Sequence, residues 1–79
     1  MKIPRDINAN NLIRLLEQHG YVVVRQTGSH IRLSKKFDDG EHAVTVPNHR
    51  PIKIGTLQRI VKDVCTANKL SIGEFYNQL

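Results

Sequence analysis

The sequence predicts a small α+β fold, in which a helix, three antiparallel strands and a second helix follow one another, with a short helix at the C-terminus. Two segments carry apolar residues at every third or fourth position, which is typical of amphipathic helices. Between them lie runs rich in β-branched residues, divided by short turn signals that join antiparallel neighbours. The 79 residues leave room for one domain, which we expect to have a core over about 8–67 and a helical extension over about 71–79.

The first helix is expected over Ala9–His19. Asn8 is a suitable N-cap, because its side chain can accept a hydrogen bond from the first turn. The apolar residues of this segment form one stripe at helical spacing: Ala9, Leu12, Ile13 and Leu16. Gly20 is placed to end the helix in the left-handed conformation.

Three strands follow, each bounded by turn residues. They are expected over Tyr21–Thr27, His30–Phe37 and about His42–Val46. Gly28-Ser29 forms the first turn and Asp38-Asp39-Gly40 the second, and Pro47 stops the last strand. Turns this short predict an antiparallel meander.

The second helix is expected over Gly55–Ala67. Its apolar stripe consists of Leu57, Ile60, Val61, Val64 and Cys65, with Ile54 one turn earlier. Cys65 is interpreted as a small buried hydrophobic residue. A last helix starts at Ser71, with Glu74 three residues later as in a capping box. We expect its apolar face to pack on the domain or on a second copy of the chain.

Alternation along the strands predicts two different sheet faces. The apolar set, which both helices can cover, is Ile31, Leu33, Val44 and Val46. The opposite, open face carries His30, Arg32, Ser34 and Lys36, with Ala43 and Thr45 beside them. We expect this open face to hold cations and no carboxylate, with further cations nearby at Arg25, Lys35, Arg50 and Lys53. A merely solvated polar face is the alternative interpretation.

The charge balance indicates a polyanionic partner. The chain has 12 Lys and Arg residues against 7 Asp and Glu residues, which gives a formal net charge of +5. No aromatic residue is expected in the middle of the open face, so binding should depend on phosphates more than on base stacking. The α-β-β-β-α order is that of a double-stranded-RNA-binding domain. We expect no metal, cofactor, signal peptide or membrane span, and therefore a cytoplasmic protein.

Several short motifs resemble those of the HicA family of toxin ribonucleases, also called YcfA-like mRNA interferases. They are Val22–Gln26, Gly28-Ser29-His30, Thr45-Val46-Pro47 and Gly55-Thr56-Leu57, and the resemblance spans about residues 10–64. It implies a double-stranded-RNA-binding-like fold, metal-independent cleavage of mRNA, a HicB-type antitoxin, and His30 as the catalytic histidine. Ile31 stands where many members have a second histidine, and Ile54 where many have proline.

The chemistry of RNA cleavage suggests a role for each candidate residue. RNA supplies its own nucleophile, the 2′-hydroxyl, so the protein needs a base, an acid and cations. We predict His30 as the general base, with Arg32 and either Lys36 or Arg25 on the phosphate. The remaining predicted RNA contacts are Ser29, His49, Arg50 and Lys53. His49 either acts as the general acid, if its loop folds over the open face, or is a solvated loop residue.

The other two histidines have structural interpretations. His19 lies at a helix C-terminus, where it favours the helix dipole, and His42 is expected to be an edge residue in the core-side register. Two other functions stay open at this stage. One is a double-stranded-RNA-binding module that does not cleave, and the other is an interaction protein whose basic face grips an acidic partner.

Overall fold

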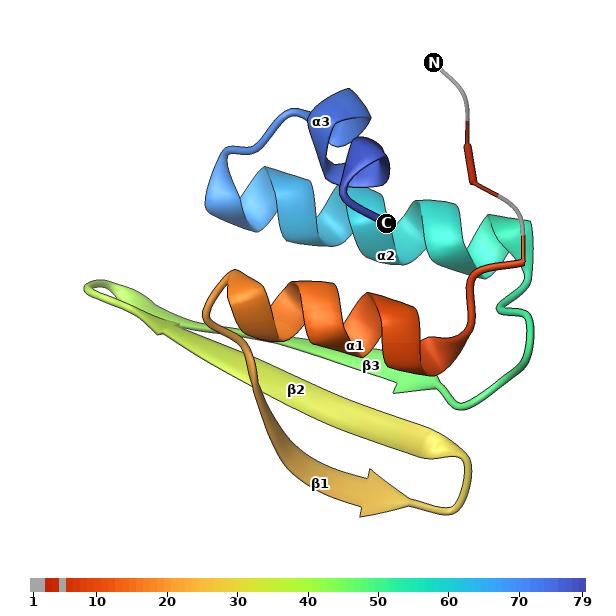
Figure 1. The fold of residues 1–79 in the computed structure, drawn as a ribbon. Coiled ribbons are helices and arrows are strands. Elements are labelled where there is room, and N and C mark those ends of the chain that lie inside the picture. Colours follow the sequence, from red (N-terminus) through yellow and green to blue (C-terminus); the bar gives the residue numbers. More distant parts are fainter. Residues whose placement is uncertain (1–2, 5) are drawn as a thin grey trace.

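The computed structural model describes residues 3–4 and 6–79 of the chain. Its elements are α1 (Ala9–Gln18), β1 (Val22–Thr27), β2 (His30–Phe37), β3 (Gly40–Pro47), α2 (Ile54–Asn68) and α3 (Ile72–Asn77) (Figure 1). The three strands form one antiparallel sheet in the order β1-β2-β3. The predicted α+β class, with α-β-β-β-α order and a short added helix, is confirmed.

The helices α1 and α2 lie side by side over one face of the sheet (Figure 1). The four strand residues predicted to face the core are all buried: Ile31, Leu33, Val44 and Val46. They meet buried leucines of α1 and the apolar stripe of α2, in which Val61 and Val64 are completely inaccessible. Cys65 is also buried, as expected, and burial raises the pKa of its thiol. No described segment covers the opposite face of the sheet (Figure 1).

Two side-chain hydrogen bonds cap the start of α1, where only one, from Asn8, was predicted. The Asn8 side chain accepts a hydrogen bond from the backbone N–H of Asn11 at 3.0 Å. The Asn11 side chain in turn accepts one from the Asn8 backbone N–H at 3.2 Å, which completes a reciprocal capping box. The helix then ends at His19, and Gly20 follows with a φ of +96°, a conformation that glycine adopts without strain.

The C-terminal helix α3 packs on its own chain, which decides between the two expectations for it. Ser71 is its N-cap, and the Ser71 Oγ accepts a hydrogen bond from the Glu74 backbone N–H at 3.3 Å. Phe75 and Tyr76 are buried, and the Phe75 ring lies 5.5 Å from the His19 ring between centroids. The outer side of the helix layer is therefore covered in part by α3.

The strand β1 differs most from its prediction. Tyr21 precedes it and is buried, whereas Val22, Val23 and Val24 are 62%, 41% and 57% exposed. The helices pack mainly over β3, at the opposite edge of the sheet, so the valines of this edge strand gain little apolar cover. A β-bulge also interrupts its pairing with β2 between Val23 and Arg25.

Two predictions about charges on the sheet were wrong. Strand β3 begins at Gly40, two residues earlier than predicted, so Glu41 lies opposite Lys36 and brings a carboxylate to the open face. Lys35 points the other way, because it alternates with Lys36 along the strand. Its Nζ donates a hydrogen bond to the Asn68 Oδ1 at 2.5 Å and lies 4.9 Å from the Phe37 ring centroid.

Candidate nucleic-acid interface

The open face presents its cations in rows set by the strand register. Arg32 on β2 has Arg25 on one side and Thr45 on the other. One row closer to the end of the sheet, His30 lies between Thr27 and Pro47. His30, Arg25 and Arg32 are all exposed. Opposite residues of neighbouring strands point to the same face, so these three side chains share one end of the open face.

The bulge in β1 is what brings Arg25 to this face. Val23 pairs with Leu33, a core residue, so simple alternation would place Arg25 on the core side as well. The extra residue at position 24 shifts the alternation by one, and Arg25 then pairs with Arg32. A sequence-based alternation cannot foresee this shift.

The turn before His30 is tied to the segment after β3. Gly28 has a φ of +58°, which suits glycine in a tight two-residue turn, and Ser29 beside it is exposed. The Ser29 carbonyl accepts a hydrogen bond from the Asn48 backbone N–H at 2.6 Å. His30 is therefore held between two backbone segments at the end of the sheet.

The loop with His49, Arg50 and Lys53 runs from this end of the sheet to the helix layer (Figure 1). The His49 carbonyl accepts a hydrogen bond from the Ala9 backbone N–H at 3.3 Å. The Ile52 backbone N–H donates to the Ile7 carbonyl at 2.8 Å. The loop backbone thus runs away from the open face. A general acid at His49 would instead require the loop to fold over that face. His49, Arg50 and Lys53 are exposed, and Lys53 is the N-cap of α2.

Lys36 lies apart from the other predicted site residues. It is six residues beyond His30 on the same strand, which corresponds to about 20 Å along an extended backbone, whereas Arg32 is only about 7 Å away. Glu41 opposite Lys36 also reduces the positive potential there. The structure therefore brings together His30, Arg32, Arg25 and the Ser29 turn, and leaves Lys36 at the far end.

His42 lies on the core side, as its register predicted, within a polar network that sequence analysis missed. The Tyr21 hydroxyl and His42 Nδ1 form a hydrogen bond of 2.7 Å, and His42 Nε2 lies 3.2 Å from the Asp63 carboxylate. The Asn68 amide donates to the Tyr21 oxygen at 2.9 Å. Burial raises the pKa of the Tyr21 phenol, although the Asn68 hydrogen bond opposes the shift. These partners are far apart in sequence and share no motif that could have revealed them.

His19 is equally remote from the open face. Its Nε2 lies 3.0 Å from the Gln78 Oε1, and its ring packs beside Phe75 in the helix layer. Within residues 3–4 and 6–79, no group of three His, Cys, Asp or Glu side chains is placed to hold a metal ion. None of the described helices is long and apolar enough to cross a membrane.

Comparison with protein families identifies the chain. The family described as "HicA toxin of bacterial toxin-antitoxin" matches residues 9–64 of the 79 residues. The chain belongs to the HicA toxin family. The match runs from the start of α1 through the whole sheet into α2, so it includes the open face with His30.

Membership of the HicA family supports a toxin role in a toxin–antitoxin system, RNA cleavage in general, and an antitoxin partner. Neither a search of curated proteins nor a search of solved structures found a significant match. The end of α2 and all of α3 lie beyond the segment that matches the HicA family.

Proposed function

We propose that this HicA toxin is an endoribonuclease that cleaves mRNA without a metal ion and uses His30 as its general base. One observation carries the proposal. His30 is exposed at the first position of β2, and two arginines stand side by side in the next row of the same face. A proton acceptor next to paired cations is what attack on a phosphodiester requires.

The reaction would use a nucleophile that RNA itself provides. His30 takes the proton of the 2′-hydroxyl, and the 2′-oxygen attacks the adjacent phosphorus. The bond to the 5′-oxygen breaks, and that oxygen receives a proton from an acid in the site or from water. The products are a 2′,3′-cyclic phosphate and a 5′-hydroxyl. Histidine suits the first step because its unperturbed pKa, about 6.5, lies near neutral pH.

The register favours Arg25 over Lys36 as the second cation on the reacting phosphate. Arg25 and Arg32 are direct cross-strand partners, about 5 Å apart at the backbone and one row from His30. Both can direct guanidinium groups at the two negatively charged oxygens that develop in the transition state. Lys36, at the far end of the strand, serves instead as a contact for a neighbouring part of the RNA backbone.

Binding of RNA would depend mainly on the phosphate backbone. No aromatic residue of the described part of the chain lies in the rows around His30. Ser29, His49, Arg50 and Lys53 extend the charged and polar surface from the His30 turn toward the start of α2. We propose that they position the RNA strand, that the protein acts in the cytoplasm, and that a HicB-type antitoxin restrains it.

The test compares cleavage of a long mRNA by the wild-type protein and by His30→Ala, in EDTA, with the ends mapped by primer extension. We expect cleavage by the wild type and none by the variant. His19→Ala is the matched control, because His19 lies in the helix layer, and it should cleave like the wild type. If neither wild type nor variant cleaves, and both bind RNA in a salt-dependent way, the protein is a binding module and the proposal is wrong.

A further inference from the structure

The two edges of the sheet differ in their ability to accept another strand. The β1 edge is broken by the bulge at Val24 and carries Arg25, features that oppose strand addition. The β3 edge pairs with β2 in unbroken register from Gly40 to Pro47. Its other side has no strand neighbour among the described residues. Of the two edges, β3 is the regular one.

The hairpin between β2 and β3 shows which backbone groups of β3 face outward. A two-residue turn, Asp38-Asp39, joins the paired residues Phe37 and Gly40, so that pair exchanges hydrogen bonds. Bonded and non-bonded pairs alternate along an antiparallel ladder. Ala43 and Thr45 are therefore in non-bonded pairs, and their N–H and C=O groups point away from β2. These groups are available to a further strand.

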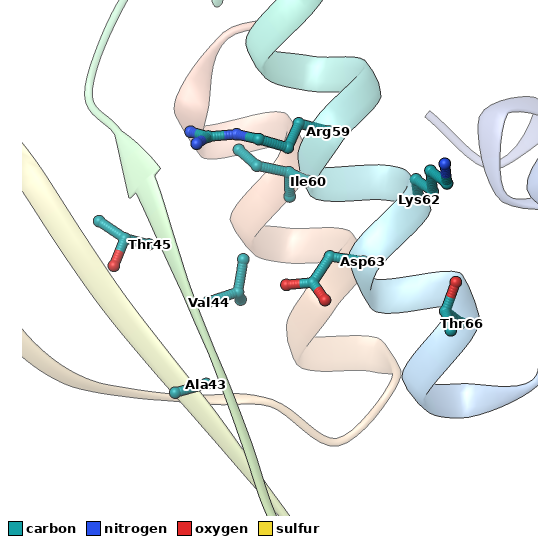
Figure 2. Close-up of a pocket in the computed structure, with 8 residues that line it drawn as sticks. All are labelled: Ala43, Val44, Thr45, Arg59, Ile60, Lys62, Asp63 and Thr66. Carbon is teal, nitrogen blue, oxygen red and sulfur yellow. The ribbon is translucent and has the colours of Figure 1, made fainter.

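A groove runs along this edge between β3 and α2 (Figure 2). Its volume is about 500 Å³, and the apolar part of its lining includes the buried side chains of Val44 and Ile60. The wall on α2 consists of residues at positions i, i+3, i+4 and i+7 of the helix: Arg59, Lys62, Asp63 and Thr66. An edge strand beside a helix, with an apolar floor, is a common binding site for an extended peptide.

The charges of the groove favour an acidic occupant. The Asp63 carboxylate already contacts His42 Nε2 at 3.2 Å. Arg59 and Lys62 are exposed, and neither makes an ion pair within the described residues. In Figure 2 the Arg59 side chain extends from α2 toward the strand, above Thr45. The groove therefore offers a net positive charge next to free backbone groups.

We propose that the groove between β3 and α2 binds an extended segment of the antitoxin, in which apolar and acidic residues alternate, as a fourth strand of the sheet. The proposal rests on membership of a toxin–antitoxin family and not on the chemistry of His30. Alternate side chains of a strand point to opposite faces, so the apolar ones would face Ile60 on α2 and the acidic ones would point to the side of the open face. Arg59, which extends toward the strand, adds positive potential at this edge (Figure 2). Thr45 is the cross-strand partner of Arg32, so the bound strand would also lie beside the RNA face.

A second copy of this chain fits the groove poorly. Two β3 edges paired about a twofold axis would bring two α2 walls together, each with Arg59 and Lys62. Like charges placed opposite one another disfavour such an interface. An acidic partner removes this repulsion, and for that reason we assign the groove to the antitoxin.

The test uses a phage-displayed library of random twelve-residue peptides, selected on the full-length protein. We expect enrichment of peptides in which acidic and apolar residues alternate. A synthetic peptide of the enriched sequence is then titrated into labelled protein, and amide shifts are followed by NMR. The shifts should centre on Ala43, Thr45 and the facing side of α2. His30→Ala should bind the peptide like the wild type, so the result does not depend on RNA cleavage.

Three variants complete the experiment. Thr45→Pro removes the outward N–H and should abolish binding, whereas Thr45→Val keeps it and should bind normally. Arg59→Glu should weaken binding roughly tenfold, while Arg14→Glu, an exposed charge reversal on α1, should not. The proposal is overturned if no peptide is enriched, if shifts map to β1 or the open face, or if the protein instead forms dimers through β3.

Discussion

Arg25 and Lys36 lie at different distances from His30 on the open face, so replacing each of them by alanine should have a different kinetic effect. Arg25 lies one row from His30, about 7 Å along the strand and one strand to the side. Lys36 lies about 20 Å from His30 along β2. Loss of a group that contacts the transition state costs roughly a hundredfold or more in rate. Arg25→Ala should therefore lower the cleavage rate about a hundredfold, as should Arg32→Ala.

Lys36→Ala should act on affinity instead. Each lost phosphate contact reduces the slope of log K against log salt by about 0.7 for single-stranded RNA. We expect this smaller slope and weaker binding, with the cleavage rate at saturation close to that of the wild type.

The assay that separates these effects is single-turnover cleavage of one labelled RNA over a range of protein and salt concentrations. The rate at saturation reports the chemical step, and the half-saturating concentration reports binding. If Lys36→Ala slows the saturated rate as much as Arg25→Ala does, the register-based assignment of the phosphate cations is wrong.

The remaining predictions concern stability, measured by urea unfolding. Tyr21→Phe should lower the free energy of unfolding by about 1–3 kcal/mol, because it removes the hydrogen-bond partner of both His42 and Asn68. Tyr76→Phe should have little effect, because the Tyr76 hydroxyl has no hydrogen bond in the described structure. Burial raises the pKa of Tyr21, Tyr76 and Cys65, so the contribution of these groups to the free energy of unfolding should be constant at neutral pH. It should fall as pH rises past the ordinary values of 9.0 for the thiol and 10.0 for the phenols, and a stability that rises there would contradict this. Ser34→Ala should be neutral or stabilising, since the Ser34 Oγ is buried without a partner among the described residues, and a loss above about 1 kcal/mol would contradict this.

Local patterns in the sequence were sufficient to predict the elements and most of the core. Of the predicted apolar stripes, Ile13 is only partly buried and Ile54 is 41% exposed, whereas Leu15, which was not predicted, is buried. The predicted ends of the helices lie within one residue of the observed ones, and β2 matches its prediction, because caps and turns are set by near neighbours in sequence. The position of His30 on an open face also followed from alternation alone. These are features for which the relevant partners lie within a few residues.

The missed features depend on partners that are distant in sequence. The bulge at Val24 arises from the pairing of β1 with β2 and reverses the side on which Arg25 lies. The carboxylate of Glu41 lies on the open face because β3 pairs with β2 for two residues more, toward the turn, than was predicted. The link from Tyr21 to His42 spans 21 residues and that to Asn68 spans 47. No local pattern contains this information.

The most direct test of the central claim is cleavage of an RNA with a single 2′-deoxynucleotide at a mapped cut site. If His30 activates the 2′-hydroxyl, the wild-type protein should fail to cleave at that position while it still binds, and the all-ribose RNA should yield a 2′,3′-cyclic phosphate. Unchanged cleavage of the deoxy-substituted RNA, or a product with a 5′-phosphate, would contradict the mechanism and show that the nucleophile comes from elsewhere.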